Sequence, residues 1–395
     1  MKLKTEITKF KLGVHTYDPS DARSLSRLYG PLRAMQKQDS RLEIIPSPLR
    51  ANEKGEMQSL SGAWDWFTEC DAVLFLDAFA AQDLNAIIFA KVAGTKVWCD
   101  YIDDLLNVRV SNPFGADFIA QRAVVRQNIE KIIELSDIAT CTTRAIKTSF
   151  AGGSKSLLER MVILPESCRW PKFELPRRRV ISWRGAAAHQ EDLESVLPAI
   201  KSVANDKAFD GWEWFFMGDP TWKVADCVPN EKLIIAPFTH PYQFMQLWAG
   251  AAPFLHIVPI VDNAFNRSKT ALAWMEATAV GAAVIGPKLP EWEDCNGVAQ
   301  YDGGNLEFPG KQDFETVLRE ELAKWEPVSA PSQNGEIKGK FHPNVEISRA
   351  DIYPDKTLEA VNELRWIILN KLAGNGQSAI GDSQRGEVKL EVVER

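Results

Sequence analysis

The sequence predicts an α/β protein with two Rossmann-like domains, each built on a mostly parallel sheet with helices on both faces. The first observation is a repeated alternation of short apolar runs with helical segments, which is typical of parallel β-α units. The second is a break at residues 165–176, which contain three prolines and precede three consecutive arginines, after which the alternation restarts. The third is the length, because 395 residues suit two or three domains.

Composition and charge narrow the class of protein. Hydrophobic residues make up 45% and charged residues 25% of the chain, which excludes a wholly disordered, collagen-like or coiled-coil protein. The net charge of −7 leaves no global positive field to attract a polyanion, although a local groove could still bind one. The cysteines and histidines lack CxxC or HExxH spacing, so no zinc site is expected. Scattered cysteines, and an N-terminus without the apolar core of a signal peptide, predict a cytoplasmic location.

Apolar runs and helical patterns define the expected elements of both halves. In the first half we expect strands at 10–16, 42–45, 72–76, 96–101 and 138–141, and helices at 24–37, 83–93 and 118–135. In the second half we expect strands at 180–183, 212–217, 233–236, 254–257 and 283–285, and helices at 191–203, 242–250 and 270–280. The stretch 233–261 lacks charged residues but holds four prolines, so it predicts a strand–helix–strand unit rather than a membrane span.

These elements predict the division of the chain into domains. An N-terminal domain is expected over residues 1–170 and a second domain over 177–350. An apolar helix at 357–372 follows, within a C-terminal segment 351–372, and a polar tail occupies 373–395. The tail contains a GxGxxA pattern, but a helix rather than a strand precedes it, so it does not indicate a dinucleotide site.

The first candidate site follows the strand at 180–183. Arg184 comes directly after this strand and before the next helix, and Gly185 would let a ligand approach the backbone. A helix N-terminus beside an arginine is suited to an anion, because the helix dipole, free N–H groups and planar guanidinium act together. Trp183 and His189 flank this position. A surface arginine that caps a loop is the alternative interpretation, and for His189 it is a helix cap or a packed side chain.

The second candidate site is the segment from Asn263 to Lys269 with the helix that follows it. Cations before a helix N-terminus are unfavourable unless an anion is bound there, so Lys269 indicates a phosphate site. Glu276 lies two helical turns further on the same face, among apolar residues, where a carboxylate needs a partner. This spacing suits a nucleotide, with the cation on the diphosphate and Glu276 on the ribose hydroxyls. A solvated ion pair on the helix is the alternative.

Carboxylates also follow a strand of the first half. Asp100, Asp103 and Asp104 could bind a metal, act as a base or cap the next helix. A metal-bound sugar nucleotide would suit a one-domain architecture, and two Rossmann-like halves argue against it. Helix capping is therefore the favoured interpretation. In the second half, Gly218 and Asp219 also follow a strand, where Gly218 would allow a ligand to approach closely.

Several of these segments together resemble a known enzyme family. The run 257–269 (IVPIVDNAFNRSK), with AWMEA and GAAVIG after it, is similar to the donor segment of GT-B glycosyltransferases. The similarity is to the retaining, family-4-like branch seen in phages and bacteria. The WRG motif at 183–185 with His189 resembles the first donor-domain loop of this group. The family has two Rossmann-like domains facing across a cleft, and its C-terminal helix packs back toward the first domain.

The resemblance implies a function and assigns residues to it. Arg184 and Lys269 would hold the diphosphate of a UDP- or GDP-sugar, and Glu276 would bind its ribose. A hexosyl- or pentosyltransferase of this kind needs no cofactor or tightly bound metal, and the retaining branch needs no protein base. If the enzyme inverts, Asp103 or Asp104 is the expected base. Further donor contacts are expected from the other residues of the same motifs, which are Trp183, Gly185, His189, Asn266 and Ser268, and from Gly218 after the strand at 212–217.

The family's usual pair of glutamates is incomplete in this sequence. The position eight residues before Glu276 is Ser268, so the residue that contacts the transferred sugar is not assigned. His256 stands at a strand end where aspartate is common.

The acceptor is left with two alternatives, a glycan precursor or hydroxymethylated pyrimidines in phage DNA. The resemblance puts the acceptor in the first domain, with Arg27, Asp77, Asp103 and Asp104 as acceptor-side residues. Residues 1–50 hold ten basic and five acidic residues, and this surplus could contact DNA or simply form a solvated helix face. A non-enzymatic two-lobed binding protein and a two-domain NAD enzyme are the remaining alternatives. A binding protein of that kind needs a signal peptide for export, which this sequence lacks. A two-domain NAD enzyme needs a glycine fingerprint after its first strand, which is also missing here.

Overall fold

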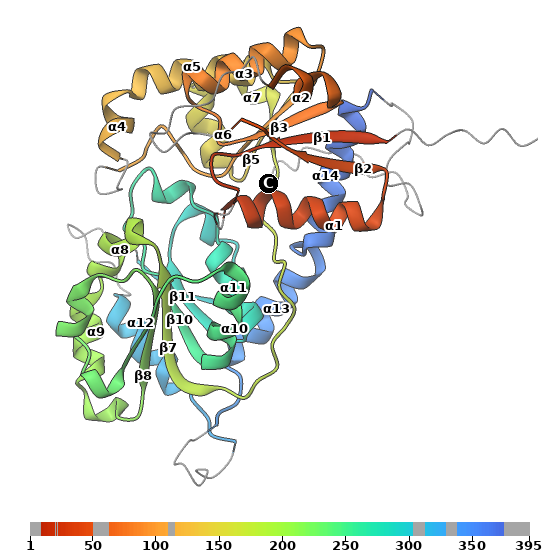
Figure 1. The fold of residues 1–395 in the computed structure, drawn as a ribbon. Coiled ribbons are helices and arrows are strands. Elements are labelled where there is room, and N and C mark those ends of the chain that lie inside the picture. The colour runs from red at the N-terminus through yellow and green to blue at the C-terminus, as the bar shows by residue number, and fades with distance from the viewer. Residues whose placement is uncertain are drawn as a thin grey trace, which may run out of the picture. The chain divides into compact units, whose positions relative to one another are not determined.

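The computed structural model describes residues 9–19, 21, 23–49, 63–109, 115–302, 313–328 and 338–374 (Figure 1). The chain packs into two compact units. The first comprises residues 1–100, 135–139 and 362–395, and the second comprises residues 101–134 and 140–361. The division at residues 170–177 expected from the sequence stays a prediction. Most of the predicted polar tail, from residue 375 on, lies outside the described residues.

The first sheet has six strands in the order β2-β1-β3-β4-β5-β6. The pairings of β1 with β2 and β3, and of β3 with β4, are parallel. The strands are β1 (Phe10–His15), β2 (Leu42–Pro46), β3 (Ala72–Leu76), β4 (Lys96–Tyr101), β5 (Ile138–Cys141) and β6 (Met161–Ile163). The helices between them are the π-helix η1 (Ser24–Tyr29), α1 (Gly30–Gln38), α2 (Trp64–Glu69), α3 (Ala81–Val92), α4 (Gly115–Ala120), α5 (Arg122–Leu135), α6 (Arg144–Ala151) and α7 (Lys155–Arg160).

The second sheet also has six strands, in the order β12-β11-β10-β7-β8-β9, and all neighbouring strands in it are parallel. Counted from β7 this is the 3-2-1-4-5-6 order of dinucleotide-binding folds. The strands are β7 (Arg178–Gly185), β8 (Glu213–Gly218), β9 (Leu233–Ala236), β10 (Pro253–Ile257), β11 (Ala283–Pro287) and β12 (Val298–Tyr301). The helices that follow them are α8 (Gln190–Glu194), α9 (Leu197–Ala204), α10 (Pro241–Ala251), α11 (Leu272–Val280), α12 (Phe314–Ala323), α13 (Pro343–Asp355) and α14 (Leu358–Leu372).

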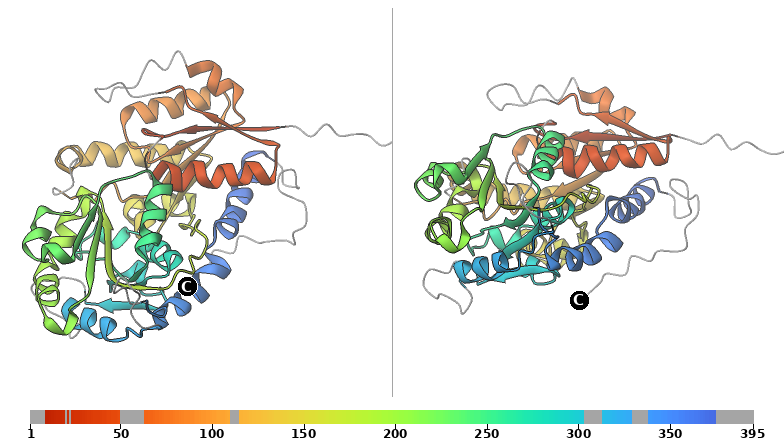
Figure 2. Two further views of the ribbon diagram at one scale, coloured as in Figure 1. Left: turned by 60° about the horizontal axis from the view of Figure 1, so that its bottom comes forward. Right: turned by 90° about the horizontal axis from the view of Figure 1, so that it is seen from below.

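Two apolar layers bury the faces of the second sheet. Successive side chains of a strand point to opposite faces, so Trp214 and Phe216 of β8 enter one layer while Phe215 and Met217 enter the other. Helices α9 and α12 supply buried residues to the first layer, and α10, α11 and α13 supply them to the second. Figure 2 shows helices flanking this sheet in both views. Burial on both faces explains why these strands are continuous apolar runs in the sequence.

The expected fold class is confirmed by these two six-stranded sheets. The stretch 233–261 forms β9, α10 and β10, and no helix among the described residues is long and apolar enough to cross a membrane. The expected helix at 24–37 begins as a π-helix, and the one at 191–203 is broken ahead of Pro198, which lies in the first turn of α9. The sequence did not predict α2, α6, α7, α12, α13, β6 or β12.

The expected C-terminal helix is α14, and from Asn362 on it belongs to the first unit. Its Asn362 side chain donates a hydrogen bond of 3.3 Å to the carbonyl of Pro31. The helix therefore packs with the first unit, as expected.

Two glycines allow β7 and β8 to end in close contact. Gly185 and Gly218 are partners in the register of the two strands. Gly218 has φ +103°, and a Cβ there would lie 2.3 Å from the carbonyl oxygen of Gly185. A Cβ on Gly185 would lie 2.6 Å from the indole of Trp183. Glycine is thus required by packing at both positions, whatever binds nearby.

We expect Gly218→Ala to lower the free energy of unfolding by roughly 3 kcal/mol or more, because a left-handed backbone and an overpacked contact add together. Gly211→Ala is the matched control, since Gly211 has φ +85° but its nearest contact is the tip of Arg179 at 3.4 Å. Its cost should be about 1–2 kcal/mol. Equal losses for both variants in urea unfolding would contradict the close-contact explanation.

Candidate functional site

The candidate site lies at the carboxyl ends of β7 and β10. The strand order of the second sheet reverses between these two strands, and ligands of open α/β sheets bind at such a reversal. Arg184 is the penultimate residue of β7, and the segment from Val258 to Ala271 leads from β10 into α11. The structure thus brings together the two segments that the sequence singled out separately.

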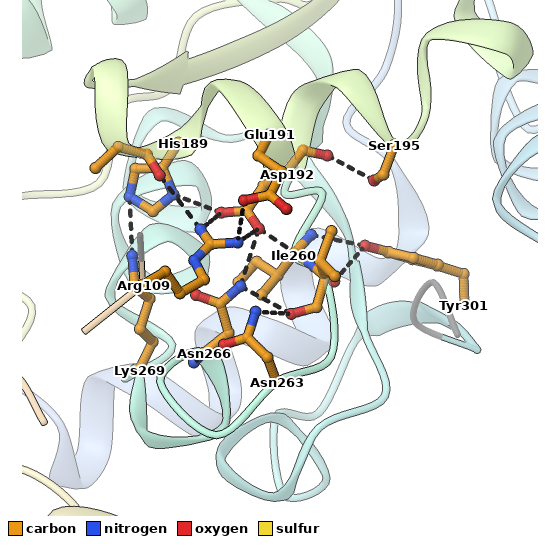
Figure 3. A network of polar contacts seen from close by, with 12 residues as sticks. Arg109, His189, Glu191, Asp192, Ser195, Ile260, Asn263, Asn266, Lys269 and Tyr301 are labelled. Carbon is orange, nitrogen blue, oxygen red and sulfur yellow. Dashed lines mark hydrogen bonds and ion pairs between the residues drawn. The ribbon is translucent and has the colours of Figure 1, made fainter. Parts of the chain in front are cut away.

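The carboxylate of Asp192 is the centre of a polar network (Figure 3). Asp192 is completely buried in α8. Its Oδ1 accepts from the backbone N–H of Val261 at 3.0 Å, from the Asn266 amide at 2.9 Å and from Arg109 Nη1 at 3.3 Å. Its Oδ2 accepts from Arg109 Nη2 at 3.2 Å and from His189 Nδ1 at 3.1 Å. One carboxylate therefore ties α8, the segment after β10 and the segment after β4 together.

The surroundings of Asp192 keep it ionised. Burial alone would raise the pKa of this carboxyl, because low dielectric disfavours charge. The hydrogen bond from His189 and the positive charge of Arg109 outweigh burial and lower the pKa below its ordinary value. A buried carboxylate with these donors is satisfied, and it holds them in place.

His189 links Asp192 to Lys269. The Nζ of Lys269 lies 3.2 Å from Nε2 of His189 (Figure 3). A lysine ammonium can only donate, so Nε2 accepts, and the imidazole proton is on Nδ1, where it is donated to Asp192. Burial and the charge of Lys269 lower the pKa of His189, which therefore stays neutral. His189 and Lys269, which were predicted separately as donor-site residues, thus lie in contact, in a geometry that fixes the ammonium.

Lys269 has an electrostatic environment suited to an anion. Burial lowers its pKa, the carboxylates of Asp103 and Asp192 raise it, and the cations of Arg109 and Arg184 lower it. Among the described residues no carboxylate forms an ion pair with Lys269, whose Nζ lies 5.0 Å from the ring centre of Phe265. Several cations thus share a partly buried region, which a bound anion would stabilise.

Arg184 and Glu276 form the second half of the site. Arg184 Nη2 donates to Glu276 Oε2 at 2.5 Å, and Glu276 Oε1 accepts from the Trp170 indole at 3.4 Å. The guanidinium carbon of Arg184 lies 5.9 and 6.0 Å from the ring centres of Phe244 and Trp248. Glu276 is 7% exposed, so the alternative of a solvated helix face is wrong. Arg184 Nε is buried and has no hydrogen-bond partner among the described residues, so one donor is left for a ligand.

The remaining predicted donor-site residues mainly contact other residues of the protein. Ser268 is buried, and its hydroxyl donates to the carbonyl of Phe265 at 2.7 Å. The Asn266 amide is used by Asp192 and by the carbonyl of Val261. Trp183 is packed in the core beneath Gly185. Direct contacts of these residues with a donor stay a prediction.

The predicted acceptor-side residues are divided between the two units. Asp104 is buried and accepts from Leu106 N–H, Asn107 and Ser149, and burial raises its pKa. The carboxylate of Asp103 is close enough to Lys269 to raise the pKa of that lysine. Asp104 thus caps a turn rather than the next helix, while Asp103 contributes charge near the site.

Arg27 and Asp77 belong to the first unit. Arg27 is buried and pairs with Asp100 through Nε at 2.7 Å and Nη2 at 3.0 Å, which corrects its expected place on an exposed basic face. Asp77 has φ +51°, and one of its carboxylate oxygens lies 3.9 Å from Arg23 Nη1. The described residues contain no cluster of three or more His, Cys, Asp or Glu suited to a metal ion.

Sequence reasoning missed Arg109 and Trp170. Arg109 also bonds Glu191 at 3.2 Å and the carbonyl of Ala188 at 3.3 Å, so the protein itself uses its donors. It lies 83 residues from Asp192 in the chain, and no local pattern signals such a pair. Trp170 stands in the proline-rich break, where no element was expected.

Several solved structures are similar to this chain in architecture. No family model and no curated protein matches the sequence. The structure of WaaG, a glycosyltransferase involved in lipopolysaccharide biosynthesis, matches with a TM-score of 0.57 over 92% of this chain and 100% of its own, at 12% identity. Anabaena HepE in complex with UDP matches with a TM-score of 0.55 over 92% and 100%, at 11% identity. The chain has the GT-B fold.

Proteins of similar structure catalyse more than one kind of reaction. A putative UDP-N-acetylglucosamine 2-epimerase from Listeria monocytogenes also matches, with a TM-score of 0.51 over 94% of this chain and 98% of its own, at 12% identity. The resemblance to GT-B glycosyltransferases is thus confirmed at the level of the fold. None of the three is described as a phage protein or as acting on DNA.

We expect Asp192→Asn to lower the free energy of unfolding by roughly 3 kcal/mol at neutral pH, the scale for breaking a buried ion pair. The pKa of Asp192 is lower in the folded protein than in the unfolded chain. Its stabilisation is therefore complete above the ordinary carboxyl pKa of about 3.9 and is lost as the pH falls through the folded value. The difference between wild type and variant in urea unfolding should shrink on acidification.

Asp226→Asn, at an exposed carboxylate of the same unit, serves as the control and should change stability by less than about 0.5 kcal/mol. A difference for Asp192→Asn that stays constant down to low pH would show that its charge is not what stabilises the network.

Proposed function

We propose that this protein is a retaining glycosyltransferase that moves a sugar from a UDP- or GDP-sugar to a hydroxyl group. The observation that carries the proposal is the convergence of Arg184 and Lys269 at the strand reversal. They lie close enough for the charge of Arg184 to lower the pKa of Lys269. Two like charges in a partly buried site are unfavourable alone and favourable around a diphosphate. UDP in the structurally similar HepE supports UDP as the nucleotide.

The reaction needs stabilisation of the charge that develops on the leaving diphosphate. Lys269, three residues before the start of α11, would bind it together with the N–H groups of that helix N-terminus. Arg184 would bind it with its free Nε–H and Nη groups, and His189 would hold the ammonium of Lys269 in position. Losing one such preorganised group typically costs on the order of 10²–10³ in rate.

Glu276 is proposed to bind the ribose hydroxyls of the nucleotide. In the free protein it accepts from Arg184, so donor binding would share or exchange that contact. The pairing gives Glu276 a partner while the site is empty, and it orients the guanidinium before the diphosphate arrives.

The proton of the acceptor hydroxyl passes to the leaving phosphate in this retaining mechanism, so no protein base is required. If the products prove inverted, Asp103 is the candidate base rather than Asp104. Asp103 lies close enough to Lys269 to raise its pKa, whereas Asp104 is buried and fully hydrogen-bonded.

The compartment and acceptor are proposed on other grounds. All six cysteines are free thiols, which suits the cytoplasmic location that we propose. The acceptor is a glycan precursor or a hydroxymethylated pyrimidine in DNA. Arg27 is buried and cannot contact DNA phosphates, so the basic surplus of residues 1–50 supports the DNA alternative less than expected.

The experiment that tests the function is incubation with a series of UDP- and GDP-sugars, followed by detection of released nucleotide and analysis of the sugar. Transfer or slow hydrolysis releases UDP or GDP. An epimerase instead yields an epimerised sugar without an acceptor. Epimerisation, or neither product from any donor, would refute the proposal.

Lys269→Ala should weaken binding of UDP or GDP by about 1.5–3 kcal/mol, the scale for a charge-assisted hydrogen bond. Isothermal calorimetry measures this directly. Lys201→Ala is the matched control, because Lys201 is exposed on α9 of the same unit. Unchanged affinity of the Lys269 variant for both nucleotides would rule out the donor-site assignment.

Removal of divalent metals should leave most of the transfer activity, because Arg184 and Lys269 supply the positive charge that a metal provides in other sugar transferases. The measurement is the rate of UDP-sugar turnover after treatment with EDTA. Complete loss with EDTA and recovery with Mn²⁺ would instead show that transfer depends on a metal, and the carboxylates Asp100, Asp103 and Asp104 would then be its candidate ligands.

A further inference from the structure

A group of hydrogen-bonded side chains lies next to Arg184 in the second unit, and the donor contacts proposed above do not involve it. Ser182 precedes Arg184 by two residues in β7, so the two side chains point to the same face of the sheet. Trp248 of α10 and His256 of β10 contact Ser182 there. All three residues are buried, so any effect that they have on a ligand passes through a neighbouring side chain.

The Ser182 hydroxyl fixes the orientation of both rings. Its oxygen accepts from Trp248 Nε1 at 3.0 Å, lies 3.0 Å from His256 Nδ1, and donates to the carbonyl of Leu255 at 3.3 Å. A serine hydroxyl has one proton, which the carbonyl takes, so the imidazole donates from Nδ1. Burial and the charge of Arg184 lower the pKa of His256, so the ring is neutral and carries this proton. One hydroxyl thus uses its donor and both acceptor positions.

The rings support the guanidinium of Arg184. The guanidinium carbon lies 6.0 Å from the ring centre of Trp248, and this ring lies 4.6 Å from that of His256. Phe244 extends the surface, 5.7 Å from Trp248 and 5.9 Å from the guanidinium carbon. Aromatic faces attract arginine, because their electron density is negative and the guanidinium is planar and cationic. The rings therefore restrict the positions that the guanidinium can take.

This support becomes more important when a donor is bound. In the free protein Glu276 also holds Arg184, through Nη2 at 2.5 Å. When Glu276 turns to the ribose hydroxyls, as proposed above, that contact is shared or lost. The bonds of Ser182 to Trp248 and His256 do not depend on Glu276, so they remain to hold the rings against the guanidinium.

We propose that Ser182, Trp248 and His256 are positioning residues that hold the Arg184 guanidinium in place for the diphosphate of the donor. The proposal rests on the donor site proposed above and adds three residues that act only through Arg184. It also gives a role to His256, which the sequence singled out without assigning it one.

The test measures the UDP affinity of the full chain by isothermal calorimetry. Ser182→Ala leaves both ring N–H groups without their acceptor, so the rings no longer hold Arg184 firmly. We expect UDP affinity to fall about three- to tenfold, the scale for a cation–π contact.

Ser348→Ala is the matched control. The buried Ser348 hydroxyl likewise accepts an indole N–H, that of Trp274, at 3.0 Å and donates to a carbonyl at 3.0 Å. The Trp274 ring lies against Lys356, whose Nζ is 5.4 Å from the ring centre. This variant should lower the melting temperature as Ser182→Ala does, but it should bind UDP as wild type does.

A double-mutant cycle separates positioning from general destabilisation. Because Ser182 acts through Arg184, Ser182→Ala should cost no further UDP affinity in an Arg184→Ala background. Trp248→Phe, which keeps a ring but lacks the N–H, takes the place of Ser182→Ala if that variant does not fold. Its loss of affinity should also vanish in the Arg184→Ala background.

Unchanged UDP affinity in Ser182→Ala, or in Trp248→Phe where it is used, would overturn the positioning role and leave the donor site standing. An equal loss in Ser348→Ala, or a loss that persists in the Arg184→Ala background, would do the same. Wild type that binds neither UDP nor GDP, or Arg184→Ala that binds them as wild type does, would overturn the donor site and the positioning role together.

Discussion

The buried carboxylate of Asp192 is the constraint on which the second unit's candidate site depends. Its contacts to His189, Arg109 and Asn266 hold three chain segments that are far apart in the sequence. A charge in this environment is stable only with all its donors present, so the segments are fixed together rather than one by one. The same arrangement positions the ammonium of Lys269, because the neutral imidazole of His189 bonds Asp192 on one side and Lys269 on the other.

The parts of the site that the sequence predicted are those with a local signal. Arg184 follows an apolar run of β7, and the segment before α11 places Lys269 at a helix start, where a cation is unfavourable alone. Glu276 stands out because it interrupts an apolar helix. Parallel topology then carries the ends of β7 and β10 to one edge of the sheet, so strand ends found separately become neighbours.

The parts that the sequence did not predict depend on contacts between distant residues. Arg109 and Asp192 form their ion pair across 83 residues, and Arg27 reaches Asp100 across 73. Spacing along a helix cannot tell a buried arginine from an exposed one, so Arg27 was expected on the surface. The π-helix was likewise missed, because its apolar pattern over six residues is the same as that of an ordinary helix turn.

Two tryptophans contact the Arg184–Glu276 pair, and their fluorescence depends on its arrangement. The Trp170 indole donates to Glu276, and the ring of Trp248 lies 6.0 Å from the Arg184 guanidinium while its N–H bonds Ser182 at 3.0 Å. Indole emission responds to the charges and donors around the ring. A ligand that rearranges the Arg184–Glu276 pair is therefore expected to alter the emission of these two indoles, so that binding would be followed without a dye or an introduced label.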